Sequence, residues 1–172
     1  RHLLKSTYAL FQYLQDNNLC GKVGFKDLGA GGVACASVEL AETSGYGSEV
    51  WLDKVHIGME GLHPSVYLCS ETQERFMWVS PSELTEKIIT HYNEVFDLPG
   101  VSSGARASAI GKIRNDKQYI VYNNGEKIID ALAEKVTKGF LYDRDYKKPD
   151  HKFHEPSLQG SLDFNTLLKK ML

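Results

Sequence analysis

The sequence predicts an α/β or α+β fold in which helices pack against one mixed β-sheet. Helix-like and strand-like hydrophobic patterns alternate along the chain up to about residue 141. The 172 residues are 42% hydrophobic and 24% charged, which is typical of one soluble globular domain with a short appendage. No internal repeat is visible, so we expect a single domain built from these alternating elements.

Hydrophobic spacing and turn residues place the first five elements. Apolar residues recur on one helical face at the start of the chain, and Asn17-Asn18 ends that pattern. Gly45 and Gly47 end a second helix. The predicted elements are a helix over residues 3–18, a strand over Val23–Phe25, a helix from about Gly32 to Thr43, a strand over Glu49–Val55 and a short helical stretch from His63 to Cys69.

The clearest local signal follows a predicted strand over Phe76–Val79. Ser80 is expected to cap a helix whose first residue is Pro81, and Glu83 completes a capping box. Apolar residues continue this helix until Leu98-Pro99-Gly100.

The later part of the chain is expected to contain a hairpin and two helices. Strand patterns over Ala107–Ile113 and Gln118–Tyr122 flank Asn115-Asp116 and predict the hairpin. Apolar residues from Ile128 to Val136 predict a helix that Gly139 ends. Residues 142–157 are dominated by charge, His and Pro, which indicates a linker, and a last helix is expected from Leu162 to Leu172. The predicted division is therefore a domain over 1–141 and a linker with a short helix over 142–172.

Charge and cysteine content exclude several function classes. The formal net charge is −2, so no global field attracts nucleic acid or an anionic membrane, and no apolar run reaches the ~20 residues of a membrane span. The 3 cysteines are widely spaced without a CxxC motif, which argues against a disulfide framework or zinc cluster and favours a cytoplasmic location. The chain begins Arg1-His2 without a methionine or signal-peptide pattern, so we interpret it as a piece of a longer protein.

A glycine-rich segment, Asp27–Gly32, joins a predicted strand to a predicted helix. Such a turn can present backbone N–H groups and a helix N-terminus to an anion, and the Asp27 carboxylate could hold Mg²⁺ beside a phosphate. The alternatives are a tight turn with Asp27 favoured by the helix dipole, or a relaxed dinucleotide fingerprint with Asp53 as a ribose ligand. The charged strand before Gly29 disfavours the dinucleotide interpretation.

A second polar segment, Ser70–Arg75, leads directly into the strand at Phe76. Glu71, Thr72 and Gln73 could hydrogen-bond a polar ligand, and Arg75 could hold a carboxylate or phosphate. The alternative is a solvated turn with a surface ion pair between Glu74 and Arg75.

The other reactive side chains form no catalytic set. The 6 histidines are scattered, and a two-histidine metal site at His151 and His154 is not expected. Cys35, inside a predicted helix, is interpreted as a buried structural thiol. Arg106, Lys112 and Arg114 form a modest basic edge that we interpret as keeping the hairpin soluble.

Four segments, taken in order, resemble phosphoribosylformylglycinamidine synthase, the large synthetase subunit or domain of purine biosynthesis. They are Asp27–Gly32, Ser37–Ala41, Leu52–Val55 and Ser70–Arg75. The resemblance runs from about residue 3 to 140 and implies the C-terminal AIR-synthase-like domain of that family's first half. It also implies that residues 142–172 lead into a missing second half, and that the preceding domain with the family's catalytic histidine is missing.

The same resemblance implies roles for individual residues, and it implies no catalytic residue in this fragment. Thr72 replaces the serine of the family's Glu-Ser-Gln motif and keeps its hydroxyl. Glu39 matches a family glutamate to which we assign no role. The implied site residues are Asp27 for magnesium, Glu71, Thr72 and Gln73 for substrate, and Gly29, Gly31 and Gly32 for the loop that approaches phosphate.

The implied reaction uses ATP to activate the formyl amide oxygen of formylglycinamide ribonucleotide, after which glutamine-derived ammonia displaces phosphate and gives the amidine. It implies Mg²⁺ as cofactor, ATP as substrate and a fused or separate glutaminase as partner, with neither nucleic acid nor membrane involved. Phosphoryl transfer of this kind depends on positioning and on metal neutralisation of charge. A fragment with half of such a site is expected to have no measurable synthetase activity and to bind Mg²⁺-nucleotide weakly.

Three other interpretations remain open at this point. The chain could belong to another ATP-dependent enzyme of the same superfold, such as AIR synthetase, a thiamine-phosphate kinase or a selenophosphate synthetase. It could be a non-catalytic binding or assembly module, or a small dinucleotide-binding domain. The run Glu71–Arg75 favours the synthase over other enzymes of the superfold, and intact Asp27 and Glu71 argue mildly against a non-catalytic module. The charged strand before Gly29 disfavours the dinucleotide-binding domain.

Overall fold

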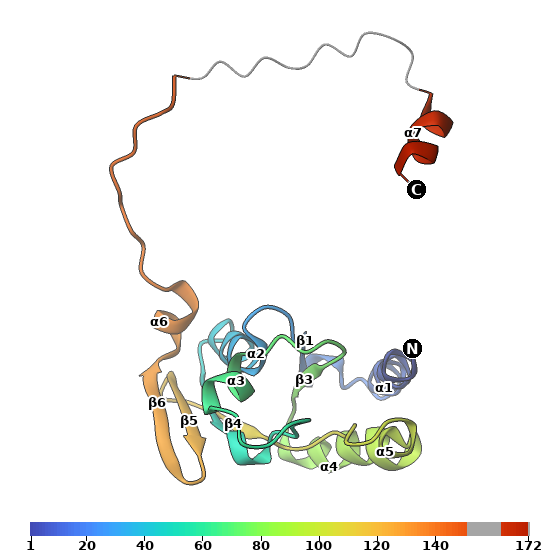
Figure 1. The fold of residues 1–172 in the computed structure, drawn as a ribbon. Coiled ribbons are helices and arrows are strands. Elements are labelled where there is room, and N and C mark those ends of the chain that lie inside the picture. The colour runs from blue at the N-terminus through green and yellow to red at the C-terminus, as the bar shows by residue number, and fades with distance from the viewer. Residues whose placement is uncertain (151–162, 172) are drawn as a thin grey trace. The chain divides into compact units, whose positions relative to one another are not determined.

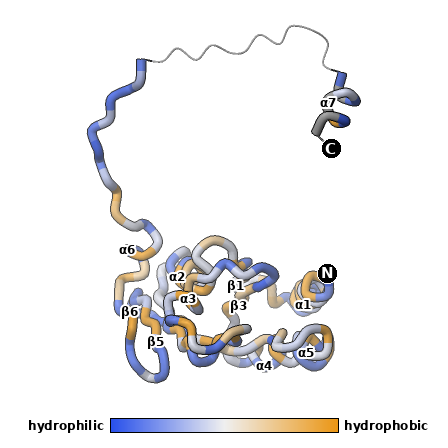
Figure 2. The backbone as a smooth tube through the Cα atoms, in the orientation of Figure 1, coloured by the Kyte–Doolittle hydropathy of each residue, from blue (hydrophilic) through white to orange (hydrophobic). Residues whose placement is uncertain are grey.

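A computed structural model describes residues 1–150 and 163–171 of the chain. Contacts divide it into one unit over Arg1–Leu141 and another over Tyr142–Leu172 (Figure 1). In the second unit, residues 142–150 form no regular element and are mostly hydrophilic (Figure 2), and α7 spans Phe164–Met171. His151 and His154 lie outside the described residues. The boundary between the two units falls after residue 141. The interpretation of residues 142–172 as a link to a missing second half stays a prediction.

The N-terminal helix and a small sheet build the first part of the first unit. The predicted helix is confirmed as α1 (His2–Asp16), which buries Leu10 and Leu14 and is followed by η1 (Cys20–Lys22). The strand β1 (Gly24–Asp27) pairs antiparallel with β3 (Phe76–Val79). This pairing is two-stranded and places Asp27 opposite Phe76.

A second sheet has the strand order β4-β2-β5-β6. Its strands are β2 (Gly47–Trp51), β4 (Gly111–Arg114), β5 (Gln118–Asn123) and β6 (Glu126–Leu132). Strand β2 is parallel to β5 and antiparallel to β4, so the prediction of a mixed sheet is confirmed. The prediction of one sheet is wrong, because the described residues form two.

Helix α2 (Gly32–Glu42) covers one face of the mixed sheet. Val33 and Ala36 of α2 share a buried cluster with Val50 of β2 and Val121 of β5. The hydroxyl groups of Ser37 and Tyr119 are 3.1 Å apart within this core, so the buried polar groups are paired. The helix thereby anchors its own N-terminus, the glycine segment, to the sheet.

The predicted hairpin between β4 and β5 is wrong, because β2 lies between these two strands. Glycines permit the close approach of the backbones: a Cβ on Gly47 would lie 2.1 Å from the Gln118 carbonyl oxygen, and one on Gly111 would lie 2.1 Å from that of Glu49. The turn at Asn115-Asp116 is therefore wide enough to admit a strand that comes from much earlier in the sequence.

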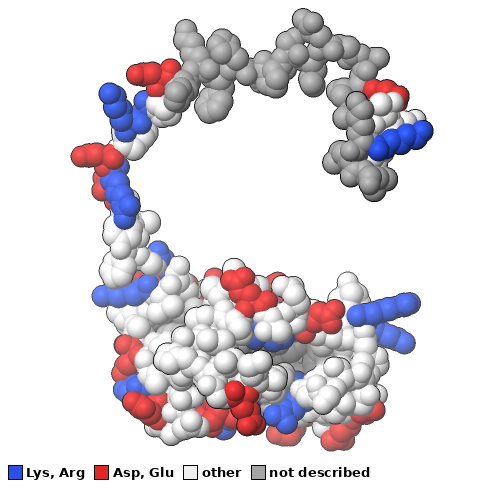
Figure 3. All heavy atoms as spheres, in the orientation of Figure 1, with Lys and Arg blue, Asp and Glu red and all other residues white. Residues whose placement is uncertain are grey.

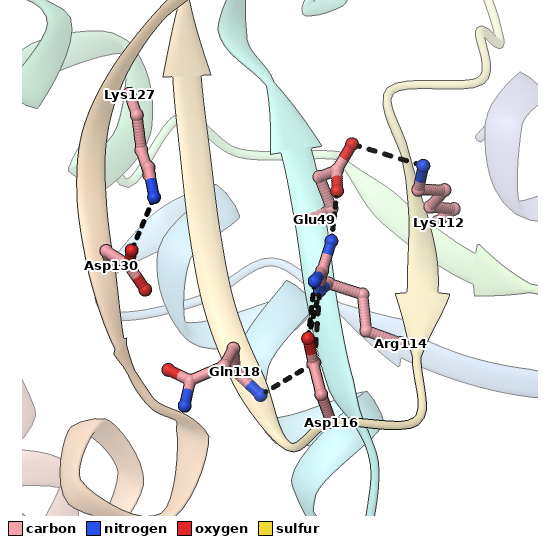
Figure 4. A network of polar contacts seen from close by, with 7 residues as sticks. All are labelled: Glu49, Lys112, Arg114, Asp116, Gln118, Lys127 and Asp130. Carbon is pink, nitrogen blue, oxygen red and sulfur yellow. Dashed lines mark hydrogen bonds and ion pairs between the residues drawn. The ribbon is translucent and has the colours of Figure 1, made fainter.

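A charged network supports this arrangement on the second face of the sheet (Figure 4). Glu49 of β2 is only 7% exposed, and its carboxylate accepts from Arg114 Nη1 at 2.5 Å and from Lys112 Nζ at 3.3 Å. Arg114 also bonds Asp116, and these hydrogen bonds, the one to Asp116 foremost, raise the pKa of the guanidinium. The network joins β4 and the following turn to the strand inserted between β4 and β5.

The helix predicted from Ile128 to Val136 is also wrong in its first half. Residues Glu126–Leu132 form β6, which pairs antiparallel with β5, and only Ala133–Lys138 form a helix, α6. The turn between β5 and β6 is Asn124-Gly125, with φ of 49° and 82°. Asn-Gly is the preferred pair for a tight hairpin turn. The apolar residues of β6 do not alternate regularly, and this irregular spacing resembles the pattern of a helix.

The remaining elements of the first unit follow β2 and β3. The helical stretch after His63 is confirmed as α3 (Pro64–Cys69), whereas β2 ends at Trp51 and η2 (Leu52–Lys54) follows it. Beyond β3 come α4 (Ser82–Thr90), a π-helical turn at His91–Val95 and α5 (Leu98–Val101).

The predicted capping box is wrong by one residue. Pro81 has extended ψ of 150° and occupies the N-cap, so α4 begins at Ser82. The Ser80 hydroxyl instead lies 3.1 Å from that of Thr85. None of the helices in the described ranges is long and apolar enough to cross a membrane.

We predict that Gly125→Ala destabilises the first unit by about 1–2 kcal/mol, because a residue with a Cβ is strained at φ of +82°. No atom lies within 4 Å of the added methyl, so the effect is conformational. Gly21→Ala is the matched control, since Gly21 has equal space and no positive φ. Urea unfolding measures both; equal stabilities of the two variants would contradict the turn assignment.

Candidate functional site

The two polar segments meet at the edge of the small sheet. The pairing of β1 with β3 brings the start of the first segment, Asp27, beside the end of the second, and Leu28 N–H donates to the Arg75 carbonyl at 3.0 Å. The Gly31 N–H donates to Glu71 Oε1 at 3.3 Å. Asp27, the glycine turn and the Glu71 carboxylate therefore form one continuous surface at the N-terminus of α2.

Gly32 makes the closest approach between the segments. A Cβ on this residue would lie 2.3 Å from the Ser70 carbonyl oxygen and 3.1 Å from the Leu68 carbonyl oxygen, and its φ is +56°. Gly31 also has positive φ, +76°, and a Cβ there would lie 2.9 Å from Cys35 Sγ. These two glycines thus have a packing role.

The glycine turn is less open to an anion than the sequence motif suggests. The Gly32 N–H donates to the Gly29 carbonyl at 3.1 Å, and the Gly31 N–H faces Glu71. Gly29 is exposed, and the nearest atom to a Cβ on it is Asp27 Oδ2 at 3.9 Å. The role of Gly29, Gly31 and Gly32 in phosphate binding stays a prediction, with Gly29 as the member of the set whose surroundings are open.

Asp27 fits a metal ion as a single ligand. Its carboxylate is exposed at the end of β1, and the absent side chain of Gly29 leaves space next to it. Within residues 1–150 and 163–171, no three His, Cys, Asp or Glu side chains converge to form a complete metal site. Mg²⁺ commonly takes one or two protein carboxylates together with phosphate oxygens and water, so the donor set is compatible with Mg²⁺ held jointly with a ligand.

A charged cluster adjoins Asp27 on the surface of α2. Lys26 Nζ and Glu39 Oε2 form an ion pair of 2.6 Å, which lowers the pKa of Glu39 and raises that of Lys26. Cys35 is half-buried and its thiol donates to Glu39 Oε1 at 3.7 Å. Burial, followed by the Glu39 charge, raises the pKa of the Cys35 thiol, which supports a structural rather than a nucleophilic role.

The predicted substrate residues lie on an exposed turn that Arg75 supports. Arg75 Nε donates to the Thr72 carbonyl at 2.9 Å, and its Nη2 donates to the Ser70 carbonyl. Thr72 and Gln73 are exposed, and Gln73 Nε2 donates to the Glu71 carbonyl at 3.4 Å. The Glu74–Arg75 pair considered from the sequence does not occur among the ion pairs of the described residues.

Gln73 and Arg75 also line a cavity of about 590 Å³ in the first unit. Its wall includes His56 and Arg106, which the sequence did not identify as site residues because neither lies in a recognisable motif. The cavity extends along β3 and the segment that leads into β4, so the turn with the predicted substrate residues lies at its edge.

Figure 3 shows charged side chains of both signs mixed over the visible face, without a broad patch of one sign.

Comparisons with known proteins identify relatives of this chain. The family model described as AIR synthase related protein, C-terminal domain, matches residues 19–123. Phosphoribosylformylglycinamidine synthase subunit PurL of Methanothrix thermoacetophila is 39% identical over 170 residues, which is 99% of this chain and 22% of the relative. The chain thus spans about a fifth of the length of that curated relative.

Solved structures show the same fold. Thermotoga maritima PurL in complex with FGAR superposes with a TM-score of 0.69 at 20% identity, covering 98% of this chain and 26% of that one. The same protein in complex with ATP gives a TM-score of 0.64 at 20% identity, covering 98% and 27%. The expected fold, an α+β domain of the AIR-synthase C-terminal type, is confirmed.

We predict that Gly32→Ala lowers the free energy of unfolding by about 3 kcal/mol, because the new methyl group would clash with the Ser70 carbonyl and carry a strained φ. Gly29→Ala, in the same turn, has space for its methyl and should change stability by less than about 0.5 kcal/mol. Chemical denaturation of both variants tests this. Similar losses in the two would show that the close approach at Gly32 is not the constraint.

We predict that Cys35 is alkylated more slowly than Cys20 and Cys69 at pH 8, because its pKa is raised and its side chain is half-buried, whereas the other two thiols are exposed. Replacing Glu39 with Gln removes a charge that disfavours the thiolate and should speed the reaction of Cys35. Iodoacetamide labelling followed by peptide mass spectrometry gives the three rates. Fastest labelling at Cys35 would argue for an activated thiol.

Proposed function

We propose the following function, given that this chain belongs to the family of AIR synthase related proteins, whose C-terminal-domain model matches residues 19–123. The chain contributes part of the substrate and Mg²⁺ site of an ATP-dependent phosphoribosylformylglycinamidine synthase. The observation that carries this proposal is the meeting of the Asp27–Gly32 segment with Glu71 at the N-terminus of α2. The 39% identity to the Methanothrix subunit supports the choice of enzyme within the family.

The residues of this chain would act by positioning. Glu71, Thr72 and Gln73 orient the ribonucleotide substrate from an exposed turn that Arg75 holds through two backbone carbonyls. Asp27 would hold Mg²⁺, which would supply neutralisation of phosphate charge. Glu71 is the link between the two functions, because its carboxylate already contacts the turn that follows Asp27.

The remaining participants come from outside this chain. ATP activates the formyl amide oxygen of formylglycinamide ribonucleotide, and ammonia from a fused or separate glutaminase displaces the phosphate. The complexes of Thermotoga maritima PurL with FGAR and with ATP support these two ligands. A cytoplasmic location remains part of the proposal.

Two alternatives keep specific support. The family also fits another ATP-dependent enzyme of the same superfold, because the fold alone does not define the substrate. A non-catalytic assembly module is the other, since Gly31 and Gly32 have packing roles that need no ligand. Substrate dependence separates both alternatives from the proposed synthase.

We predict that this chain can replace the matching segment of the Methanothrix subunit, giving a chimera that releases ADP when supplied with ATP, formylglycinamide ribonucleotide and ammonium. Asp27→Asn should lower kcat/KM of the chimera about a hundredfold or more, because one metal ligand is lost. Asp53→Asn is the matched control, an exposed carboxylate after β2 that only a dinucleotide site would use. A coupled ADP assay measures all three proteins.

The outcomes separate the hypotheses. Activity that survives Asp27→Asn unchanged would contradict the metal assignment. Loss of activity in Asp53→Asn alone would favour a dinucleotide site. A folded chimera that lacks activity with formylglycinamide ribonucleotide, but turns over another phosphate acceptor, would indicate a different enzyme of the superfold.

A further inference from the structure

The 590 Å³ cavity carries a cluster of basic groups that the proposed roles leave unused. His56, Arg75 and Arg106 all line it. The two guanidinium groups lie close enough to the imidazole that their charges, after burial, lower the pKa of His56. No carboxylate pairs with Arg75 or Arg106 among the ion pairs of the described residues. Two carboxylates also line the cavity, Glu74 and Glu49, of which Glu49 is paired with Lys112 and Arg114, and neither forms an ion pair with Arg75 or Arg106 among the described residues.

His56 supplies an unused polar atom. Within the described ranges, its Nδ1 is the buried side-chain nitrogen or oxygen without a hydrogen-bond partner. A buried polar atom left unpaired costs free energy, typically about 1–3 kcal/mol, so its persistence calls for a ligand or a functional reason. An anion between the imidazole and the guanidinium groups would provide that partner.

The two arginines offer different donors. Arg75 uses Nε and Nη2 on the Thr72 and Ser70 carbonyls, which fixes its guanidinium at the cavity and leaves Nη1 without a hydrogen bond among the described residues. Arg106 is exposed and lies on the segment that leads into β4. One guanidinium held by backbone carbonyls and one exposed guanidinium are suited to bind a phosphate together.

The rest of the cavity wall suits the organic part of a small ligand. Met77 and Ile110 supply apolar surface, while Gln73, a predicted substrate residue, stands at the edge. A cavity of this size with mostly apolar walls and a few convergent polar groups is typical of a small-molecule site. The basic cluster and Gln73 line the same cavity, so one molecule in it could contact both.

We propose that His56, Arg75 and Arg106 bind the phosphate group of a ribose-phosphate ligand whose sugar lies toward Gln73. The anion site stands on the geometry of the cavity. The further statement that its ligand is the ribonucleotide substrate rests on the proposed function. The phosphate would then be held in the cavity while the reacting end of the substrate faces Glu71 and Asp27.

The test is a titration of the whole chain with ribose 5-phosphate, ribose and inorganic phosphate, followed by NMR of ¹³C-labelled histidine rings. We expect saturable shifts at His56 with ribose 5-phosphate, none with ribose, and weaker binding of inorganic phosphate at the same ring. Arg106→Gln should weaken ribose 5-phosphate about tenfold, because it removes a charge-assisted hydrogen bond. Lys135→Gln, an equal loss of charge on exposed α6 away from the cavity, should change Kd less than twofold.

A second variant excludes a purely structural explanation. His56→Leu should raise the melting temperature, because it removes the unpaired Nδ1, while it weakens ribose 5-phosphate binding. A lower melting temperature with unchanged affinity would overturn the role of His56. The absence of a saturable shift, or equal affinities of Arg106→Gln and Lys135→Gln for ribose 5-phosphate, would overturn the anion site. The arginines would then be explained by pairing with an acidic segment of another domain.

The chimera separates this inference from the proposed function. If Arg106→Gln in the active chimera raises KM for formylglycinamide ribonucleotide about tenfold and changes kcat less than twofold, both proposals hold. If ribose 5-phosphate binds the chain but the chimera does not turn over, the anion site stands and the proposed enzyme is wrong. An active chimera with unchanged KM in Arg106→Gln would show that the substrate phosphate binds elsewhere.

Discussion

The close approach of α2 to the turn after α3 is the constraint on which the site depends. Gly32 allows the helix N-terminus to lie against the Ser70 carbonyl, where any Cβ would clash. That contact fixes the start of the Glu71–Arg75 turn, and the β1–β3 pairing fixes its end. Between these two anchors, Arg75 holds the turn through backbone carbonyls and Glu71 reaches the Gly31 N–H. Packing and polar contacts thus position the same few residues.

Opposite charges occupy the two sides of this turn. Asp27 and Glu71 lie toward α2, and Glu39 with its Lys26 partner extends the charged surface there. His56, Arg75 and Arg106 lie toward the cavity, together with one carboxylate of the turn, Glu74. A carboxylate side favours a cation and a basic side favours an anion, so a ligand that carries a phosphate at one end and reacts with a metal-bound phosphate at the other would match both. Gln73 lies between the two regions.

Local patterns predicted most elements, whereas the arrangement of the mixed sheet needed information from distant residues. The helices at His2–Asp16 and Gly32–Glu42 and the strand Phe76–Val79 follow from hydrophobic spacing. The insertion of β2 between β4 and β5 does not, because Gly47, Gly111 and the Glu49 network act across the sequence. The Asn124-Gly125 hairpin was predictable from its turn residues, which the periodicity of the following segment obscured. The motif residues of the candidate site stand out in the sequence, and their roles stay predictions; His56 does not stand out, since its environment comes from β3 and the segment before β4.

The position of β2 has a consequence for how the chain is made. Strand β2 pairs with residues on both sides that come from 111–114 and 119–122, so neither neighbour exists when Gly47–Trp51 leaves the ribosome. Until residues 111–122 have been synthesised, the apolar face of α2 and Val50 have no completed sheet to cover them. Sheet formation must therefore wait for synthesis to pass Tyr122, and long-range pairing of this kind folds slowly. The small β1–β3 pair with the turn that carries Glu71 needs only the chain up to Val79, so this turn can be assembled before the mixed sheet is complete.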